Sequence, residues 1–346
     1  MYFALRDLRT AQGRFALIAG VVLLLSVLVA GLLGLTAGLA HQSVSALRAL
    51  GSGDSSFVLP ADENGAVDLD RAAFTEGQLN DVTAADPSAV PVGVARIRVD
   101  DGSETGVSAV AVGLGGSVGS LTPPPPGEVL ASTGVGDEVG AGATELRVDS
   151  SALRVTGGVG DLWHSHTPVV VTDLATWHEL APRGGAATTV AVSSAESVSH
   201  AGLTVVDPDG LVSSLPSHRA ENTSLNTMTF MLLAVTALVV GAFFAVWGMQ
   251  RRRDVAVIKA LGGSTTAVVR DAVGQAAIVL AVGIGGGVGI AALFGVVARG
   301  AVPYVVSPAT TVLPAVLLAV LGLAGAAVSL RPVVAADPAT ALGSLR

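Results

Sequence analysis

This chain has few charged residues, a single lysine and no cysteine. Only 13% of its 346 residues are Asp, Glu, Lys or Arg, whereas 51% are hydrophobic. A soluble domain averages roughly 25% charged residues. The absence of cysteine excludes disulfides and thiolate metal sites, so a domain outside the cytoplasm would have to be held together by its own core. The composition therefore favours a membrane protein.

Four windows contain no Asp, Glu, Lys or Arg. They cover residues 15–47, 222–250, 272–298 and 300–330. A helix needs about 20 residues to cross a bilayer core of about 30 Å, and each window can supply that many. The sequence predicts four transmembrane helices, near residues 15–39, 228–249, 272–297 and 312–330.

The first window has a second interpretation, as a secretory signal. Gly38 and Ala40 would make a small-residue cleavage site. The apolar run of about 25 residues exceeds the roughly 7 to 15 residues of a signal-peptide core. We expect this window to be retained as a transmembrane helix.

The basic residues near the helix ends predict the orientation. Arg6, Arg9 and Arg14 precede the first window, and a basic cluster beginning at Arg251 separates the second from the third. Basic flanks stay in the cytoplasm, so both termini are predicted to be cytoplasmic in a multi-pass protein of the cell membrane. Residues 41–221 are then extracellular, with 8 arginines against 23 acidic residues.

The large extracytoplasmic segment is predicted to be a mixed α/β domain. Short apolar or alternating runs bounded by turn residues indicate strands, and they begin at Phe57, Ala95, Val107, Glu145, Pro168 and Thr188. Asp173 is predicted to cap a helix. His164 and His166 would share one face of a strand and could bind a metal, but no third ligand is evident, so we expect surface or loop histidines.

The chain has no motif for binding ATP. A P-loop needs glycines before its lysine and a hydroxyl after it, and Lys259 has neither in VIKAL. As a helix, RRRDVAVIKAL would place Ile258 and Leu261 opposite Arg252 and Lys259, with Asp254 on the apolar side. The residues leave two interpretations open, an anchor at the inner membrane surface or a docking element for a separate cytoplasmic motor.

Three segments resemble the FtsX-like (MacB-type) ABC transporter permeases. They are FFAVWGMQRRRDVAVIKALGGSTTAVVRDAVGQ, the closing RPVVAADPATALGSLR and the opening ALRDLRTAQGRF. The resemblance implies a homodimer bound to two copies of a separate ABC ATPase, which supplies the ATP and Mg site, so the chain itself is not expected to be an enzyme. It implies ATPase-coupling roles for Arg251, Arg252, Arg253, Asp254, Ile258, Lys259 and Leu261.

This sequence departs from the family in two respects. The family usually has glutamate where Asp254 stands, so the partner of this carboxylate could differ. The extracytoplasmic domain is about 180 residues, shorter than in the lipoprotein and macrolide branches, so their substrates do not transfer directly.

Charge and resemblance together predict the organisation of the chain. The fold class is membrane α-helical, with four transmembrane helices and one mixed α/β extracytoplasmic domain inserted between the first and second. The segments are a cytoplasmic elbow helix (1–14), transmembrane helix 1 (15–40), the α/β domain (41–221), transmembrane helix 2 with its outer stalk (222–250), a cytoplasmic coupling loop (251–270), transmembrane helix 3 (271–298), a short outer loop (299–311), transmembrane helix 4 (312–330) and a cytoplasmic tail (331–346).

Four short sequence segments are similar to those of the heme-exporting permeases of the HrtB type. FFAVW, MQRRRDVAVIKALGG, RDAVGQA and TPVVVTDLATW carry this resemblance. It implies that heme is exported from the membrane as the dimer opens and closes, with heme as substrate rather than cofactor, and with no nucleic-acid partner. Heme iron takes axial ligands from side chains, and the candidate heme-binding residues are Glu221, Met228, Met231, His218, Arg219 and His41.

Among these candidates, Glu221 and Met228 are seven residues apart and would share a helix face. In a twofold dimer two copies of Glu221 could approach one iron. No metal site is expected beyond a heme iron ligand. Two alternatives stay open: export of another lipophilic compound, peptide or antibiotic, or a mechanotransmitting regulator of an outer cell-wall hydrolase.

Glycine pairs four residues apart are typical of close helix packing in membranes. Such pairs occur at Gly34 and Gly38, at Gly283 and Gly287, and at Gly285 and Gly289. We expect all three pairs to be packing sites.

Overall fold

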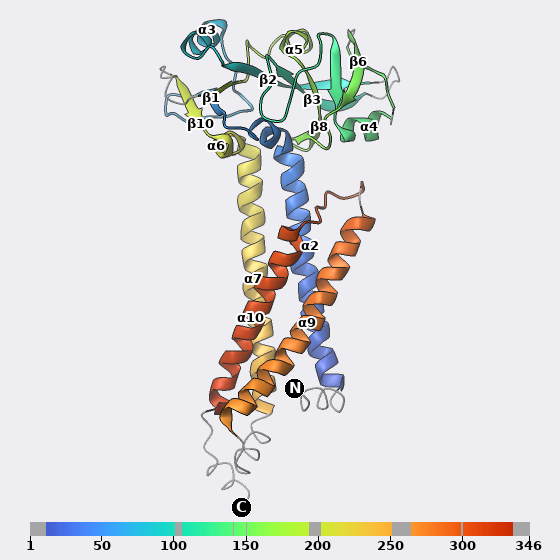
Figure 1. Cartoon of the computed structure of the whole chain (residues 1–346), viewed down its shortest axis with the longest axis vertical. Helices are drawn as coiled ribbons and strands as arrows, with labels where there is room; N and C mark the ends of the chain where they lie inside the picture. Colours follow the sequence, from blue (N-terminus) through green and yellow to red (C-terminus); the bar gives the residue numbers. More distant parts are fainter. Residues whose placement is uncertain are drawn as a thin grey trace, which may run out of the picture. The chain divides into compact units, whose positions relative to one another are not determined.

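The computed structural model describes residues 12–100, 106–140, 142–149, 151–193, 202–250, 264–298 and 300–334. The chain divides into two compact units. One, called here the helical unit, comprises Met1–Gly38 and Leu225–Arg346; the other, the sheet domain, comprises Leu39–Ser224. Figure 1 shows the four long helices and the sheet, whose strands follow the first helix and precede the second in the sequence.

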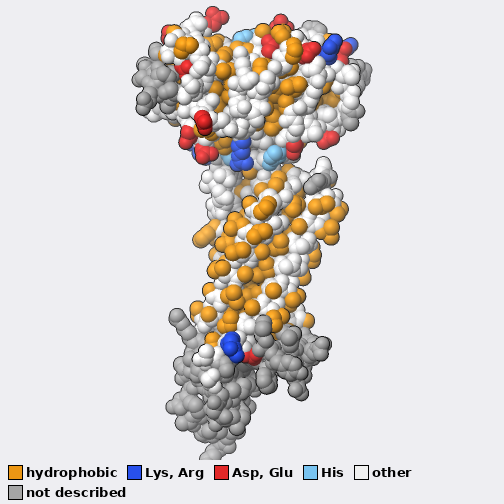
Figure 2. All heavy atoms as spheres, in the orientation of Figure 1, with side chains coloured by type: hydrophobic (Ala, Val, Ile, Leu, Met, Phe, Trp, Pro, Cys, Tyr) orange, Lys and Arg blue, Asp and Glu red, His pale blue; other side chains and the backbone are white. Residues whose placement is uncertain are grey.

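Four helices are long and apolar enough to cross a membrane. They are α2 (Gln12–Leu50), α7 (Pro216–Gln250), α9 (Thr265–Val297) and α10 (Pro308–Val334). The prediction of four transmembrane helices is confirmed, and the chain is a multi-pass membrane protein. In the helical unit, Phe15, Phe244 and Trp247 pack edge to face, with ring centroids 6.0–6.4 Å apart. On the face shown in Figure 2, apolar side chains cover much of the surface of these helices.

The three glycine pairs have three different surroundings. A Cβ at Gly287 would lie 2.5 Å from the Leu23 carbonyl oxygen, so the Gly283 and Gly287 pair does bring α9 against α2. At Gly34 and Gly38 the close neighbour is a loop rather than a helix, because Cβ atoms there would lie 2.1 Å from Tyr304 and from the Pro303 carbonyl. The prediction for Gly285 and Gly289 is wrong within this chain, since a Cβ at either would meet nothing within 4 Å among the described residues.

The sheet domain contains one ten-stranded mixed sheet. The order along it is β10-β1-β9-β2-β3-β8-β4-β6-β5, with β7 paired to β8, and the β3–β8 and β4–β6 pairs are parallel. The strands are β1 (Ser56–Pro60), β2 (Val90–Val99), β3 (Val107–Leu114), β4 (Glu128–Ala131), β5 (Glu145–Val148), β6 (Ser151–Gly158), β7 (Trp163–His164), β8 (Thr167–Asp173), β9 (Thr189–Val192) and β10 (Leu203–Val206). All six predicted strands are present, and the mixed α/β prediction is confirmed.

Helices cover both faces of the sheet, because both faces carry buried apolar side chains. Along β3, Val110 and Val112 belong to one buried cluster and Ala111 belongs to another. Successive strand residues point to opposite faces. The first cluster takes in α6 (Pro208–Ser213), while α3 (Glu76–Ala85), α4 (Thr133–Val139) and α5 (Leu174–Leu180) contribute to the others. Asp173 caps α5 as predicted, accepting hydrogen bonds from the amides of Ala175 and Thr176.

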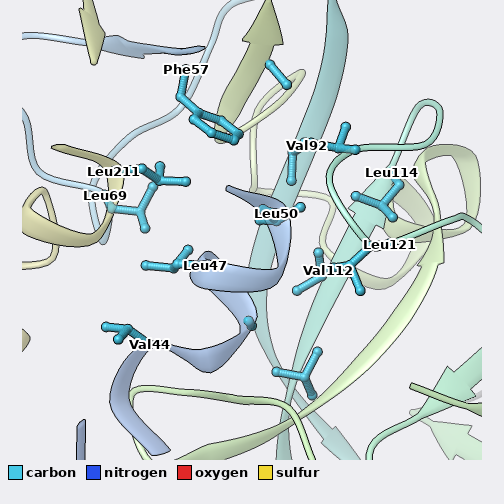
Figure 3. Close-up of a cluster of buried hydrophobic side chains, with 14 of the residues drawn as sticks. Val44, Leu47, Leu50, Phe57, Leu69, Val92, Val112, Leu114, Leu121 and Leu211 are labelled. Atoms are coloured by element: carbon cyan, nitrogen blue, oxygen red, sulfur yellow. The ribbon is translucent and has the colours of Figure 1, made fainter. Parts of the chain in front are cut away.

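Helices α2 and α7 are longer than the predicted spans because their ends belong to the sheet domain. Val44, Leu47 and Leu50 of α2 are fully buried in the first cluster, against β2, β3 and α6 (Figure 3). Burying each such side chain contributes roughly 1.5–3 kcal/mol, which extends the helix well past the predicted end at residue 39. Leu215, just before α7, is buried in the same cluster. Both helices therefore run from the sheet domain into the helical unit without a break.

Candidate functional site

Histidines lie on the sheet-domain parts of α2 and α7 and on the hairpin between β7 and β8. His41 lies on α2, His164 on β7, His166 in the turn after β7, and His218 near the start of α7. These are four of the six histidines in the chain. Figure 2 shows histidine on this domain beside basic and acidic side chains.

The turn between β7 and β8 has an uncommon backbone. Trp163 pairs with Pro168 and His164 with Thr167, which leaves Ser165 and His166 as a two-residue hairpin loop. Their φ angles are 48° and 60°. A type I′ turn needs positive φ at both positions and usually uses Asn-Gly. Without glycine the left-handed conformation costs roughly 1–2 kcal/mol per residue, so surrounding contacts must hold this turn.

Those contacts come from α2. The Ser165 amide donates to the Ser43 carbonyl oxygen and the His166 amide to the Gln42 carbonyl oxygen, both at 2.9 Å. The hydroxyl of Ser45 accepts from the Trp163 amide at 2.8 Å. The turn is thereby fixed along one side of α2.

The same turn also contacts α7. Nε2 of His166 lies 3.1 Å from Oε2 of Glu221. One helical turn earlier, Nδ1 of the buried His218 lies 3.2 Å from the Ser43 hydroxyl. Two side-chain contacts therefore join α7 to the turn and to α2, within the sheet domain. The side chains of His166 and Glu221 remain 40% and 29% exposed, so a ligand could reach both.

His164 is unsuited to bind a ligand. It is only 4% exposed, and its Nδ1 has no hydrogen-bond partner. Burial lowers the pKa of His164 to about 4, with a smaller contribution from the positive charge of Arg96. The expectation of surface or loop histidines is wrong for His164, which is buried on β7, and correct for His166, which lies in the turn. The two do not share a strand face, because the turn leaves one buried and the other half exposed.

The remaining candidates lie apart from this contact. Nε2 of His41 is 2.9 Å from the Asp161 carbonyl oxygen and 3.1 Å from its carboxylate. Arg219 is exposed on α7. Met228 and Met231 are further along α7, in the helical unit, and are 57% and 62% exposed. Within the described residues, no three His, Asp or Glu side chains are grouped as metal ligands.

The predicted coupling residues fall outside the described residues. They are Arg251, Arg252, Arg253, Asp254, Ile258, Lys259 and Leu261. Their role stays a prediction.

Sequence reasoning missed the contact of His166 with Glu221. The two residues are 55 positions apart, and no local pattern joins them. The available signal was WHSH, which stands just before a strongly apolar strand and so indicates a hairpin turn.

Residues 226–338, which contain most of α7 and all of α9 and α10, match the model of the FtsX-like permease C-terminal family. This part of the chain is thus the C-terminal region of an FtsX-like permease. The periplasmic region of MacB from Actinobacillus actinomycetemcomitans aligns with 49% of this permease and 96% of that chain, at 12% identity and a TM-score of 0.34. A TM-score this low does not establish a common fold.

Curated relatives of this permease carry a name that refers to hemin transport. HrtB of Staphylococcus epidermidis, named as a hemin transport system permease protein, is 22% identical over 202 residues, which is 58% of each chain. HrtB of Staphylococcus haemolyticus is 28% identical over 144 residues, covering 42% of this chain and 41% of its own. The chain thus matches between 41% and 58% of the length of these relatives.

Proposed function

We propose that this chain is the permease subunit of an ABC-type efflux pump that exports heme. Two copies would form a homodimer and bind two copies of a separate cytoplasmic ATPase, which holds ATP and Mg. Both termini would be cytoplasmic and the sheet domain extracellular, as the basic flanks favour. Heme would enter from the membrane and leave as ATP binding and hydrolysis open and close the dimer.

The continuity of α2 and α7 supports the mechanical part of this proposal. Each helix begins or ends in the core of the sheet domain and continues as an apolar helix of spanning length. Val44, Leu47 and Leu50 hold α2 rigidly in that core. Protein cores are close-packed and transmit strain, so a shift of these helices would be passed to the sheet domain.

The observation that carries the heme proposal is the position of Glu221. Its carboxylate is partly exposed at the end of an apolar helix and contacts an imidazole. An ionisable group at the edge of a span is a candidate functional site, and heme iron needs an axial ligand in an apolar setting. Met228 and Met231 would extend the apolar surface along α7. The names of the curated relatives agree with this substrate.

A hemin titration tests the proposal. The purified full chain in nanodiscs should give a saturable Soret absorption band, and Glu221→Ala should weaken binding at least about tenfold because the iron ligand is lost. Glu179→Ala is the matched control, since Glu179 is an exposed glutamate on α5. If the wild-type chain does not bind hemin, while lipids, peptides or antibiotics stimulate the associated ATPase, the substrate is one of those. Co-purification of a cell-wall hydrolase without any such stimulation would favour the regulatory alternative.

The coupling prediction has its own test. Arg252→Glu with Lys259→Glu should abolish co-purification of the ATPase, because two attractive charges become repulsive, and should leave hemin absorption intact. Arg71→Glu with Arg183→Glu makes the same charge change on exposed arginines of the sheet domain. If the ATPase is retained by the first pair of substitutions, the cations only anchor the helix at the membrane surface.

A further inference from the structure

His166 and Glu221 form one side-chain hydrogen bond, with Nε2 of His166 3.1 Å from Oε2 of Glu221. An ionised carboxylate can only accept hydrogen bonds, so with Glu221 in that form the bond is donated by the Nε2–H tautomer of His166. No other hydrogen bond to the Glu221 carboxylate comes from the part of the chain that the structure describes. Its second oxygen, Oε1, is therefore available to a ligand.

His166 is held in place independently of Glu221. Its amide is bonded to the Gln42 carbonyl oxygen, and the preceding Ser165 amide to the Ser43 carbonyl oxygen. These hydrogen bonds stabilise the positive φ angles of two consecutive non-glycine residues, Ser165 and His166. Backbone strain of this kind concentrates at functional sites, where the surroundings keep a side chain in place. The imidazole is thus presented to α7 from a fixed turn on α2.

The other three histidines of this region make no hydrogen bond to Glu221 among the described residues, although the charge of Glu221 acts on His218. His41 is bonded to Asp161, His218 to Ser43, and His164 is buried. Among the described residues, His166 alone donates to this carboxylate.

We propose that His166 is a positioning residue for Glu221, which it holds by Oε2 so that Oε1 can ligate the ferric iron of heme. This inference rests on the proposed heme-export function. Carboxylates that bind metals are usually hydrogen-bonded themselves, and the loss of such a partner typically lowers metal affinity 10- to 100-fold. The sheet domain would then contribute to substrate recognition as well as to movement.

The variants that test this role remove the imidazole without disturbing the backbone of the turn. His166→Gly removes the side chain and tolerates positive φ, so the hairpin should stay intact. His166→Gln keeps an N–H donor at a similar reach. His178→Ala is the control for loss of an exposed histidine, since His178 lies on α5 and contacts the Ala186 carbonyl oxygen.

The experiment is a hemin titration of the full chain in nanodiscs, followed by Soret absorption and by electron paramagnetic resonance of the ferric iron. His166→Gly should raise the Kd about 10- to 100-fold and change the resonance spectrum. His166→Gln should restore most of the affinity, and His178→Ala should match the wild type. In a Glu221→Ala background, His166→Gly should change the Kd by less than about twofold, because a positioning residue acts only through its partner.

Three results would overturn the inference. If His166→Gly binds hemin with wild-type affinity and spectrum while Glu221→Ala does not, His166 has no positioning role and the proposed function stands. If the losses multiply in the double variant, His166 acts on heme separately from Glu221. If the wild-type chain does not bind hemin at all, the proposed function and this inference both fail.

Discussion

The two parts of helix α2 have the same kind of sequence and opposite surroundings. In the helical unit, Leu24 and Leu28 are 64% and 50% exposed. In the sheet domain, Leu47 and Leu50 of the same helix are 1% and 0% exposed. A lipid chain is about as apolar as leucine, so the first part does not need protein around its leucines, whereas the second part does. Apolar sequence alone therefore does not distinguish a span from a core helix.

The largest effect should come from truncating a leucine in the buried part of α2. Leu50→Ala leaves a cavity in the sheet-domain core and should cost about 2–5 kcal/mol of unfolding free energy. Leu28→Ala, on the exposed part of the same helix, should cost less than about 1 kcal/mol. Thermal unfolding of the two variants in nanodiscs compares them directly. Equal losses would contradict the difference in surroundings, and would indicate that a second copy of the chain covers Leu28.

Lowering the pH from 6.5 to 4 should destabilise the sheet domain. The pKa of His164 is lowered on folding from 6.5 to about 4. The unfolded chain therefore takes up this proton first as the pH falls, and stability is lost between pH 6.5 and pH 4, by up to about 3 kcal/mol. Hydrogen exchange of the β8 amides measures the effect. The His164→Asn variant should lose most of this pH dependence; an unchanged profile would assign it to other groups.

Adding a methyl group to a closely packed glycine of the helical unit should have an intermediate effect on stability. A Cβ at Gly38 would lie 2.1 Å from the Pro303 carbonyl oxygen, whereas one at Gly31 would meet nothing within 4 Å. Gly38→Ala should therefore cost about 1–3 kcal/mol, and Gly31→Ala should be neutral or slightly stabilising. Unfolding temperatures of the two variants test this. No loss in Gly38→Ala would show that the loop between α9 and α10 is not held against α2.

The smallest effect should come from the hydroxyl of Tyr304. It donates to the Ala30 carbonyl oxygen at 3.2 Å, while the ring fills the space left by Gly34 and Gly295. Tyr304→Phe keeps the ring and should cost about 0.5–1.5 kcal/mol. Tyr304→Ala empties that space and should cost more. If both variants lose the same stability, the ring does not contribute to this contact.

The sequence was sufficient for the parts of the fold that depend on local patterns. Charge-free windows located the four spans, and short apolar or alternating runs located six strands. The capping residue Asp173 located a helix. The sequence missed β4, β6, β7 and β10, which are short or exposed and are fixed by pairing with other strands. It also ended α2 too early, because the burial of Leu47 and Leu50 depends on β2 and β3, which come later in the chain.

The candidate site was predictable only in part. Glu221 could be singled out because it is a charge at the edge of an apolar window. His166 could not be assigned to it, since their contact requires both the hairpin turn on α2 and the early start of α7. The glycine pairs show the same limit: spacing identified small residues, but not whether a helix, a loop or nothing lies against them.

Transport in reconstituted vesicles tests the central claim most directly. The chain and the cytoplasmic ATPase proposed as its partner would be placed in liposomes with apomyoglobin trapped inside and hemin in the membrane. On addition of ATP outside, wild-type and Glu179→Ala proteins should load the trapped apomyoglobin with heme, and Glu221→Ala should lose most of this signal. Heme export from the site at Glu221 is contradicted if ATP causes no loading, or if Glu221→Ala loads as fast as the wild type.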